Sequence, residues 1–156
     1  MIKYIPAFLL LLASTLSLAN EPVSKSYWGS KAIGGHDTVE YHSPVVRTQH
    51  KEVAGDKRFA VEWNNASWHF ASQASADKFA ADPKRFRPEY NGFCSNALSL
   101  GEGLITTDGT VWEFFGDKLH LFYAEQGRQR WLNGDWKTYK QQADTAWAAK
   151  LNNAEY

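Results

Sequence analysis

The sequence predicts a small α+β fold in which two antiparallel β-hairpins pack against about four helices. Two pairs of short segments alternate apolar and polar residues on either side of a turn, which is typical of half-buried hairpins. Four further segments carry apolar residues at the spacing of one helix face. Since all of these segments fall within residues 32–151, we expect this stretch to form a single domain.

The first hairpin is predicted over residues 58–63 and 67–70. Asn64-Asn65 supplies the turn, because asparagine tolerates a positive φ. Trp68 and Phe70 then face the core. The same alternation places His69 on the opposite face, where we expect an exposed histidine.

The second hairpin is predicted over residues 110–115 and 118–122, around Gly116-Asp117. Its inward residues are expected to be Trp112, Phe114, Leu119 and Leu121. His120 lies between the last two of them. The pattern therefore predicts a second histidine on an exposed face.

The first of the four helices is predicted to begin at Ser72 as its N-cap and to end at Asp82-Pro83. A short second helix is predicted from apolar residues at one-face spacing, namely Phe93, Ala97 and Leu100. The last two helices are predicted over residues 125–133 and 136–151. Between the elements, residues 32–42 are expected to be strand-like up to Ser43-Pro44, and residues 83–92 to be rich in turns.

The N-terminus has the features of a secretory signal peptide. Lys3 is followed by an apolar run and then by the small-x-small sequence Ser17-Leu18-Ala19, which predicts cleavage after residue 19. The run is too short for a membrane anchor, which takes about 20 apolar residues, so we expect no stable membrane insertion after cleavage. Residues 20–31 are polar and are expected to be a flexible lead-in.

Composition excludes some partners. The chain has 17 basic and 17 acidic residues, so it has no positive surplus that favours nucleic acid or an anionic membrane. Its single cysteine, Cys94, excludes an intramolecular disulfide. Seven tryptophans fit either a core of large rings or an aromatic groove.

Cys94 is the first candidate functional residue. If Asn91 is a helix N-cap, Cys94 is the third residue of that helix, where free backbone N–H groups stabilise a thiolate. The alternative is a small buried apolar residue, as most free cysteines are. His36-Asp37 is the second candidate, because a carboxylate can orient an imidazole for metal binding or proton transfer. Asp37 alternatively caps a local turn.

Four motifs resemble those of exported bacterial YHS-domain proteins. They are GHDTVEY at residues 35–41, WNNASWHFAS at 63–72, FAADPKRF at 79–86, and YNGFC at 90–94 with Ala97 and Gly101 following. Each motif is weak alone, and together they are specific. The resemblance covers most of the predicted domain and implies a YHS-like fold and a periplasmic location.

The resemblance also implies metal handling, of copper especially, through cysteines beside the central hairpin and helix. This sequence departs from that pattern, because the segment from Phe70 to Ser75 contains no cysteine. It is similar instead to a subgroup, related to selenoproteins, that keeps one later cysteine at the position of Cys94.

Three functions remain open. In the first, Cys94 with His36 or His42 and Asp37 holds a soft metal such as Cu(I), since thiolate and imidazole suit that ion. In the second, Cys94 performs thiol redox chemistry with a periplasmic partner protein that supplies the resolving thiol. In the third, a non-catalytic module binds a ligand or protein in an aromatic groove, lined by some of Trp63, Trp68, Trp112 and Trp131, and Cys94 is structural. A binding or accessory role is expected over an enzymatic one.

Overall fold

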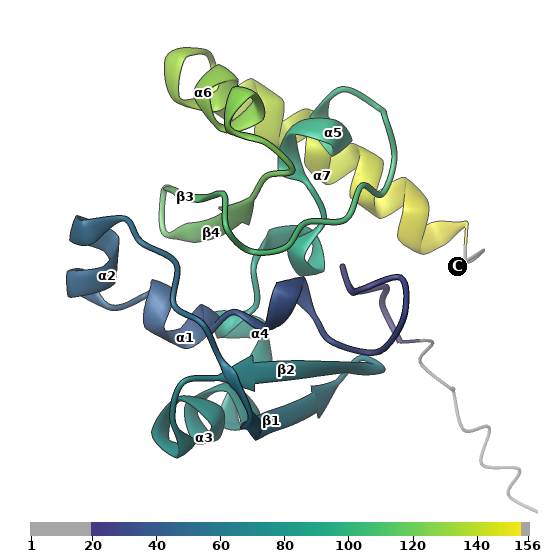
Figure 1. Cartoon of the computed structure of the whole chain (residues 1–156). Helices are drawn as coiled ribbons and strands as arrows, with labels where there is room; N and C mark the ends of the chain where they lie inside the picture. The colour runs from purple at the N-terminus through teal and green to yellow at the C-terminus, as the bar shows by residue number, and fades with distance from the viewer. Residues whose placement is uncertain (1–19, 154–156) are drawn as a thin grey trace, which may run out of the picture.

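The computed structural model describes residues 20–153 and confirms the α+β class, with two antiparallel hairpins and seven helices in this part of the chain (Figure 1). The hairpins are β1 (Asp56–Trp63) with β2 (Ala66–Phe70), and β3 (Trp112–Phe115) with β4 (Lys118–Leu121). The helices are α1 (Thr38–Tyr41), α2 (Pro44–Gln49), α3 (Gln73–Ala81), α4 (Pro83–Phe86), α5 (Ser95–Ser99), α6 (Glu125–Asn133) and α7 (Trp136–Asn152).

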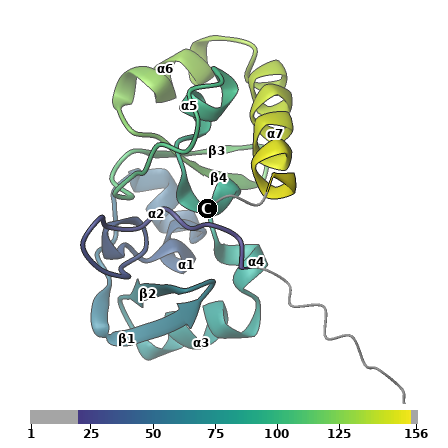
Figure 2. The same ribbon diagram turned by 90° about the vertical axis from the view of Figure 1, so that its right-hand side faces the viewer.

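The β3–β4 hairpin lies between two hydrophobic cores (Figures 1 and 2). One of its faces gives Trp112, Leu119 and Leu121 to the core that also contains Trp68 and Phe79. Its other face, and the residues just beyond it, give side chains to the core under α5, α6 and α7, which contains Phe115, Phe122 and Trp131. The hairpin is therefore buried on both faces.

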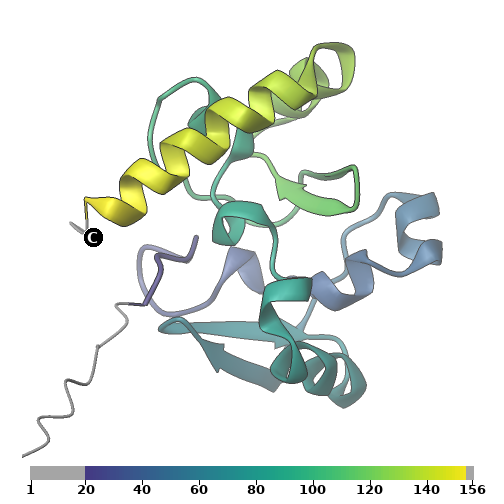
Figure 3. The same ribbon diagram turned by 180° about the vertical axis from the view of Figure 1, so that it is seen from behind.

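The β1–β2 hairpin closes the first core from one side, with α3 packed against it (Figure 3). Asn64 and Asn65 form its turn with φ of 50° and 57°, as expected. The Trp68 ring stacks on Phe79 of α3 at 5.1 Å between centroids. Ser72 caps α3 by accepting a hydrogen bond from the Ser75 N–H, and the helix ends before Asp82.

The expectation of a strand over residues 32–42 is wrong, because residues 33–35 form a 3-10 turn and Asp37 begins a helix. The Asp37 Oδ1 atom accepts the Glu40 N–H at 2.9 Å and starts α1. Ser43 then caps α2, with Pro44 at its first position, where a missing N–H costs nothing. Asp82 likewise caps α4 within the predicted turn-rich stretch.

Residues 21–24 pack onto the domain. Val23 and Ser24 are buried, and the Ser24 N–H donates to the Asn91 carbonyl oxygen at 3.0 Å. The side chain of Asn91 in turn donates to the Pro22 carbonyl oxygen. The expected flexible lead-in thus has a docked start and an exposed loop after residue 24. The predicted signal peptide lies outside the described residues, and no helix within 20–153 is long and apolar enough to cross a membrane.

Replacement of Asp37 tests what holds α1 to β2. Its carboxylate is fully buried and accepts two backbone N–H groups, from Glu40 and from Ala71. Asp37→Ala leaves both donors without an acceptor, so we expect a loss of about 3 kcal/mol in the free energy of unfolding by urea. Asp37→Asn should lose less, because one acceptor oxygen remains.

The matched control is Asp77→Ala, which removes an exposed carboxylate on α3 that bonds only to Gln73. Its urea midpoint should stay near that of the unsubstituted protein. Equal stability of Asp37→Ala and Asp77→Ala would contradict the structural role.

Candidate functional site

Cys94 lies at the start of α5, and its thiol is a hydrogen-bond acceptor. The residue is itself the N-cap of that helix, so the expected third position after an Asn91 cap is wrong. The Sγ atom accepts the Ala97 N–H at 3.4 Å and the Tyr123 N–H at 3.3 Å. Only 4% of the residue is exposed. The thiol therefore ties the first turn of α5 to the chain that leaves β4.

Asn91 is not the helix N-cap that the sequence predicts. It is fully buried, with φ of 50°, and its side-chain amide donates to Glu21 and to Pro22. This amide fastens the start of the described chain to the segment that precedes Cys94. The predicted cap position is thus used for tertiary attachment.

A cleft of about 280 Å³ borders Tyr123, the residue whose backbone N–H donates to the Cys94 thiol. This aromatic-rimmed cleft is lined by Lys25, Ser26, Tyr27, Gly34, Thr106, Thr107, Asp108 and Tyr123. Among these lining residues Cys94 contacts Tyr123, whose backbone N–H donates to its Sγ atom. The Cys94 N–H donates to the carbonyl oxygen of Ile105, the residue that precedes Thr106. The cleft and the thiol therefore share one piece of backbone.

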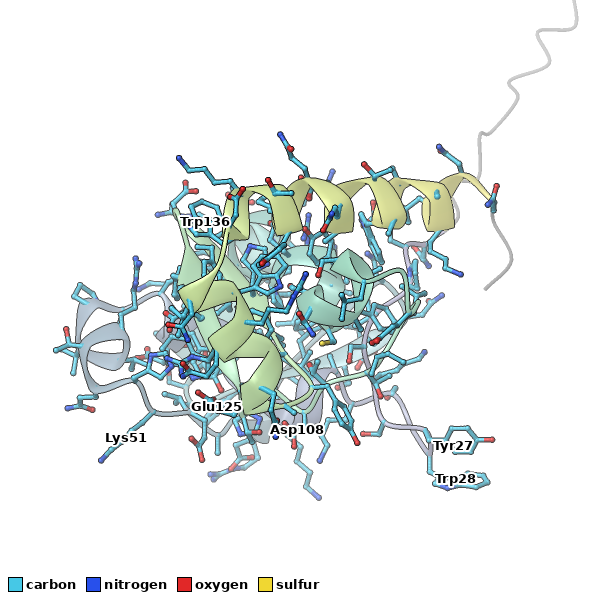
Figure 4. The ribbon with its side chains drawn as sticks, turned by 90° about the horizontal axis from the view of Figure 1, so that it is seen from above. Tyr27, Trp28, Lys51, Asp108, Glu125 and Trp136 are labelled. Carbon is cyan, nitrogen blue, oxygen red and sulfur yellow. The ribbon has the colours of Figure 1, made fainter. Side chains whose placement is uncertain are left out.

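The rim of the cleft is the most exposed aromatic surface among the described residues. Tyr27 is 90% exposed, Trp28 beside it is 89% exposed, and Tyr123 is 71% exposed. The Tyr27 and Trp28 rings meet edge to face at 5.0 Å. Figure 4 shows both rings extending away from the body of the molecule.

The base of the cleft is rigidly built. Ser24 Oγ accepts the Thr107 N–H at 2.9 Å and donates back to the Thr107 carbonyl oxygen at 3.2 Å. Gly34, with φ of +66°, lies so close to Asp108 that a Cβ there would collide with the Asp108 carbonyl oxygen. The docked lead-in and the 106–108 segment thus hold the cleft open from two sides.

The four predicted metal ligands do not gather into a centre. Asp37 uses both carboxylate oxygens for backbone N–H groups, and the His36 Nδ1 atom lies 3.3 Å from the Ile33 carbonyl oxygen. His42 packs edge to face on Phe86 and Phe114. Across residues 20–153, no group of three or more His, Cys, Asp or Glu side chains is arranged to hold a metal ion.

The tryptophans predicted to line an aromatic groove belong to the cores instead. Trp68, Trp112 and Trp131 are buried, and Trp63 is partly buried against the first core. The most exposed rings are those of Tyr27 and Trp28, which lie in the polar stretch that the sequence predicts to be a lead-in. The sequence does contain a sign of this exposure. Two adjacent large aromatic residues lie in a segment without the apolar periodicity of a buried strand or helix.

The expectation that His120 is exposed is wrong. It is fully buried, because α5, α6 and α7 cover the second face of the β3–β4 hairpin. Its Nδ1 atom lies 2.8 Å from Ser95 Oγ, and its Nε2 atom has no partner among the described residues. Burial lowers the pKa of His120 to about 3. A serine and a histidine at this distance resemble a nucleophile and its base, yet both are sealed from solvent.

The comparisons with known proteins return nothing. No model of a known protein family matches the chain, and no curated protein or solved structure matches it. The site must therefore be interpreted from its own residues.

The buried histidine predicts how stability depends on pH. The unfolded chain takes up a proton at His120 near pH 6.5, whereas the folded chain does so only near pH 3. Between these values the unfolded state binds more protons, so the free energy of unfolding falls as pH falls. From pH 7 to pH 5 we expect a loss of about 2 kcal/mol from this residue, measured by urea unfolding.

His120→Gln supplies the comparison, since glutamine keeps a polar group toward Ser95 without titrating. Its stability at pH 7 is expected to be lower, and its decline between pH 7 and pH 5 shallower. An unchanged pH slope in this variant would show that His120 does not titrate as its burial requires.

Proposed function

We propose that the chain is a binding module of the bacterial periplasm, of the YHS type, that engages a partner protein through Tyr27, Trp28 and the aromatic-rimmed cleft. The observation that carries the proposal is the near-complete exposure of two adjacent large rings beside that cleft. Tyrosine and tryptophan are enriched among the residues that dominate protein interfaces. Exposed rings of this size lower the solubility of a protein unless a partner covers them.

A protein fits this surface better than a small molecule. The cleft, at about 280 Å³, is at the small end of ligand pockets, and the rings stand on a loop that projects from the body (Figure 4). A partner can cover the loop and insert one of its own side chains between Tyr27 and Tyr123. Cys94 supports this surface from inside by holding the backbone of Tyr123.

Site-specific photocrosslinking in living bacteria tests the module. A photoreactive phenylalanine analogue replaces Tyr27 or Trp28, and each should give the same discrete adduct with a second protein, identified by mass. The matched control places the analogue at Leu132, an exposed apolar residue on α6 that does not border the cleft. No adduct at Tyr27 and Trp28, or the same adduct at Leu132, would contradict the proposal. The purified protein alone should give no dimer-sized adduct.

A second candidate function uses the thiol. The N–H groups of Ala97 and Tyr123 would remain as donors to a sulfur that carries negative charge, as a metal-bound or nucleophilic thiolate does. This contact favours a periplasmic redox-accessory or soft-metal role for Cys94, with Cu(I) as the ion that thiolate ligands suit. Either role requires the residues that bury the Cys94 sulfur to move aside.

Anaerobic titration with Cu(I) against a chromogenic chelator tests the second candidate. If Cys94 binds the ion, the protein takes up one equivalent and Cys94→Ser takes up none, since a hydroxyl is a poor ligand for Cu(I). Cys94→Ser keeps an acceptor for the Ala97 and Tyr123 N–H groups, so its fold is retained. Equal uptake by both proteins excludes Cys94 as the ligand and leaves it a structural cap.

A further inference from the structure

A second cleft, separate from the aromatic-rimmed one, is lined mainly by cations. This basic cleft has a volume of about 520 Å³ and is lined by His42, Arg47, Asp82, Lys84, Arg85, Asp117 and Lys118. Its residues come from the end of α1, from α2, from the start of α4, and from the turn and first residue of β4. The two clefts share no lining residue.

The cations of the basic cleft are uncommitted. Within residues 20–153, none of Arg47, Lys84, Arg85 and Lys118 makes an ion pair, and none of their side-chain nitrogens makes a hydrogen bond to the protein. Four positive charges face two carboxylates, so the cleft carries a surplus of two (4 − 2). A charge surplus in a concave surface concentrates anions there.

Both arginines are held in place without being neutralised. The Arg47 guanidinium lies over the Phe114 ring at 3.9 Å, and that of Arg85 lies 5.2 Å from the Phe86 ring. Stacking of this kind uses the face of the guanidinium and leaves its N–H edge free to bond an oxyanion in two places. The rings therefore orient the donors before a ligand arrives.

His42 adds a polar group with no partner. Its ring is fixed edge to face between Phe86 and Phe114, and its Nε2 atom is buried without a hydrogen bond among the described residues. Burial, and then the charges of Arg47, Arg85 and Lys118, lower the pKa of His42 to about 4. Burial and the positive charges of the cleft therefore keep the His42 ring neutral at physiological pH.

The basic cleft continues into an apolar one. A neighbouring cavity of about 540 Å³ shares His42, Asp82 and Arg85 with it. The rest of that cavity is lined by Val39, Pro44, Ala81 and Phe86, together with Glu40, Ser43 and Lys78. A ligand that spans both cavities would place a charged group among the cations and an apolar body against Phe86.

We propose that this double cleft binds a small organic phosphate, with the phosphate group held by Arg47, Arg85 and Lys118 and the apolar body in the adjoining cavity. A phosphate monoester carries close to two negative charges at neutral pH and so matches the surplus of the cleft. Its tetrahedral oxygens can accept from several guanidinium and ammonium donors at once. This site is independent of the partner surface at Tyr27 and Trp28.

Titration of the purified, isotope-labelled protein with phenyl phosphate tests the site by NMR. Saturable shifts are expected at the residues around His42, Arg85 and Lys118. Inorganic phosphate should bind the same residues more weakly, because it lacks the apolar body, and phenol should not bind there. Shifts that phenyl phosphate and phenol produce alike, or phenyl phosphate shifts that do not saturate, would overturn the proposal.

Charge-removing variants locate the contact. Arg85→Gln and Lys118→Gln should each weaken phenyl phosphate binding at least about tenfold, the equivalent of one charge-assisted hydrogen bond. Lys57→Gln is the control, because it removes one positive charge from the exposed surface of β1, outside the cleft. An equal loss in Lys57→Gln would show that only net charge matters and would reject the site.

Vesicles separate a free phosphate compound from a lipid headgroup. Phosphatidylcholine vesicles with and without phosphatidic acid, which carries a phosphate monoester, are sedimented with the protein. The proposed small ligand predicts no sedimentation with either vesicle under conditions where phenyl phosphate binds. Sedimentation that needs phosphatidic acid and is lost in Arg85→Gln would overturn the assignment to a small ligand and identify the phosphate as a headgroup.

Discussion

Burial of the β3–β4 hairpin on both faces is the constraint on which the rest of the structure depends. An isolated two-stranded hairpin is marginal in water, and here each face gives side chains to a hydrophobic core. One face completes the core of β1, β2 and α3, and the other completes the core of α5, α6 and α7. The docked Val23 belongs to the first core. Ser24 beside it bonds to Asn91, Ile33 and Thr107, and so it positions the cleft beside Tyr27.

The sequence predicts those elements whose stability comes from local pattern. The turns at Asn64-Asn65 and Gly116-Asp117, the Ser72 cap and the bounds of α6 follow from spacing and turn chemistry, and the structure has them there. Single-face alternation also predicts that His120 is exposed. That inference fails because alternation cannot show that helices 125–133 and 136–152 cover the second face.

The errors at the candidate site have a common physical cause. Asp37, Asn91 and Cys94 are polar or polarisable groups that meet backbone N–H and C=O groups distant in the sequence. From sequence spacing alone, such a residue can equally be a metal ligand, a helix cap or a reactive thiolate. Tyr27 and Trp28 are the converse case, since their exposure becomes visible only once the fold shows that nothing covers them.

The late position of the central hairpin in the sequence constrains how the chain acquires its structure. The segment from residue 20 to residue 111 contains β1, β2 and α3, but the layer that closes their core lies at residues 112–121. Because synthesis runs from the N-terminus, β1, β2 and α3 are made before Trp112, Leu119 and Leu121, which complete their core. The two cores are therefore completed by the same segment, residues 112–121, so both can close only after the β3–β4 hairpin has been made.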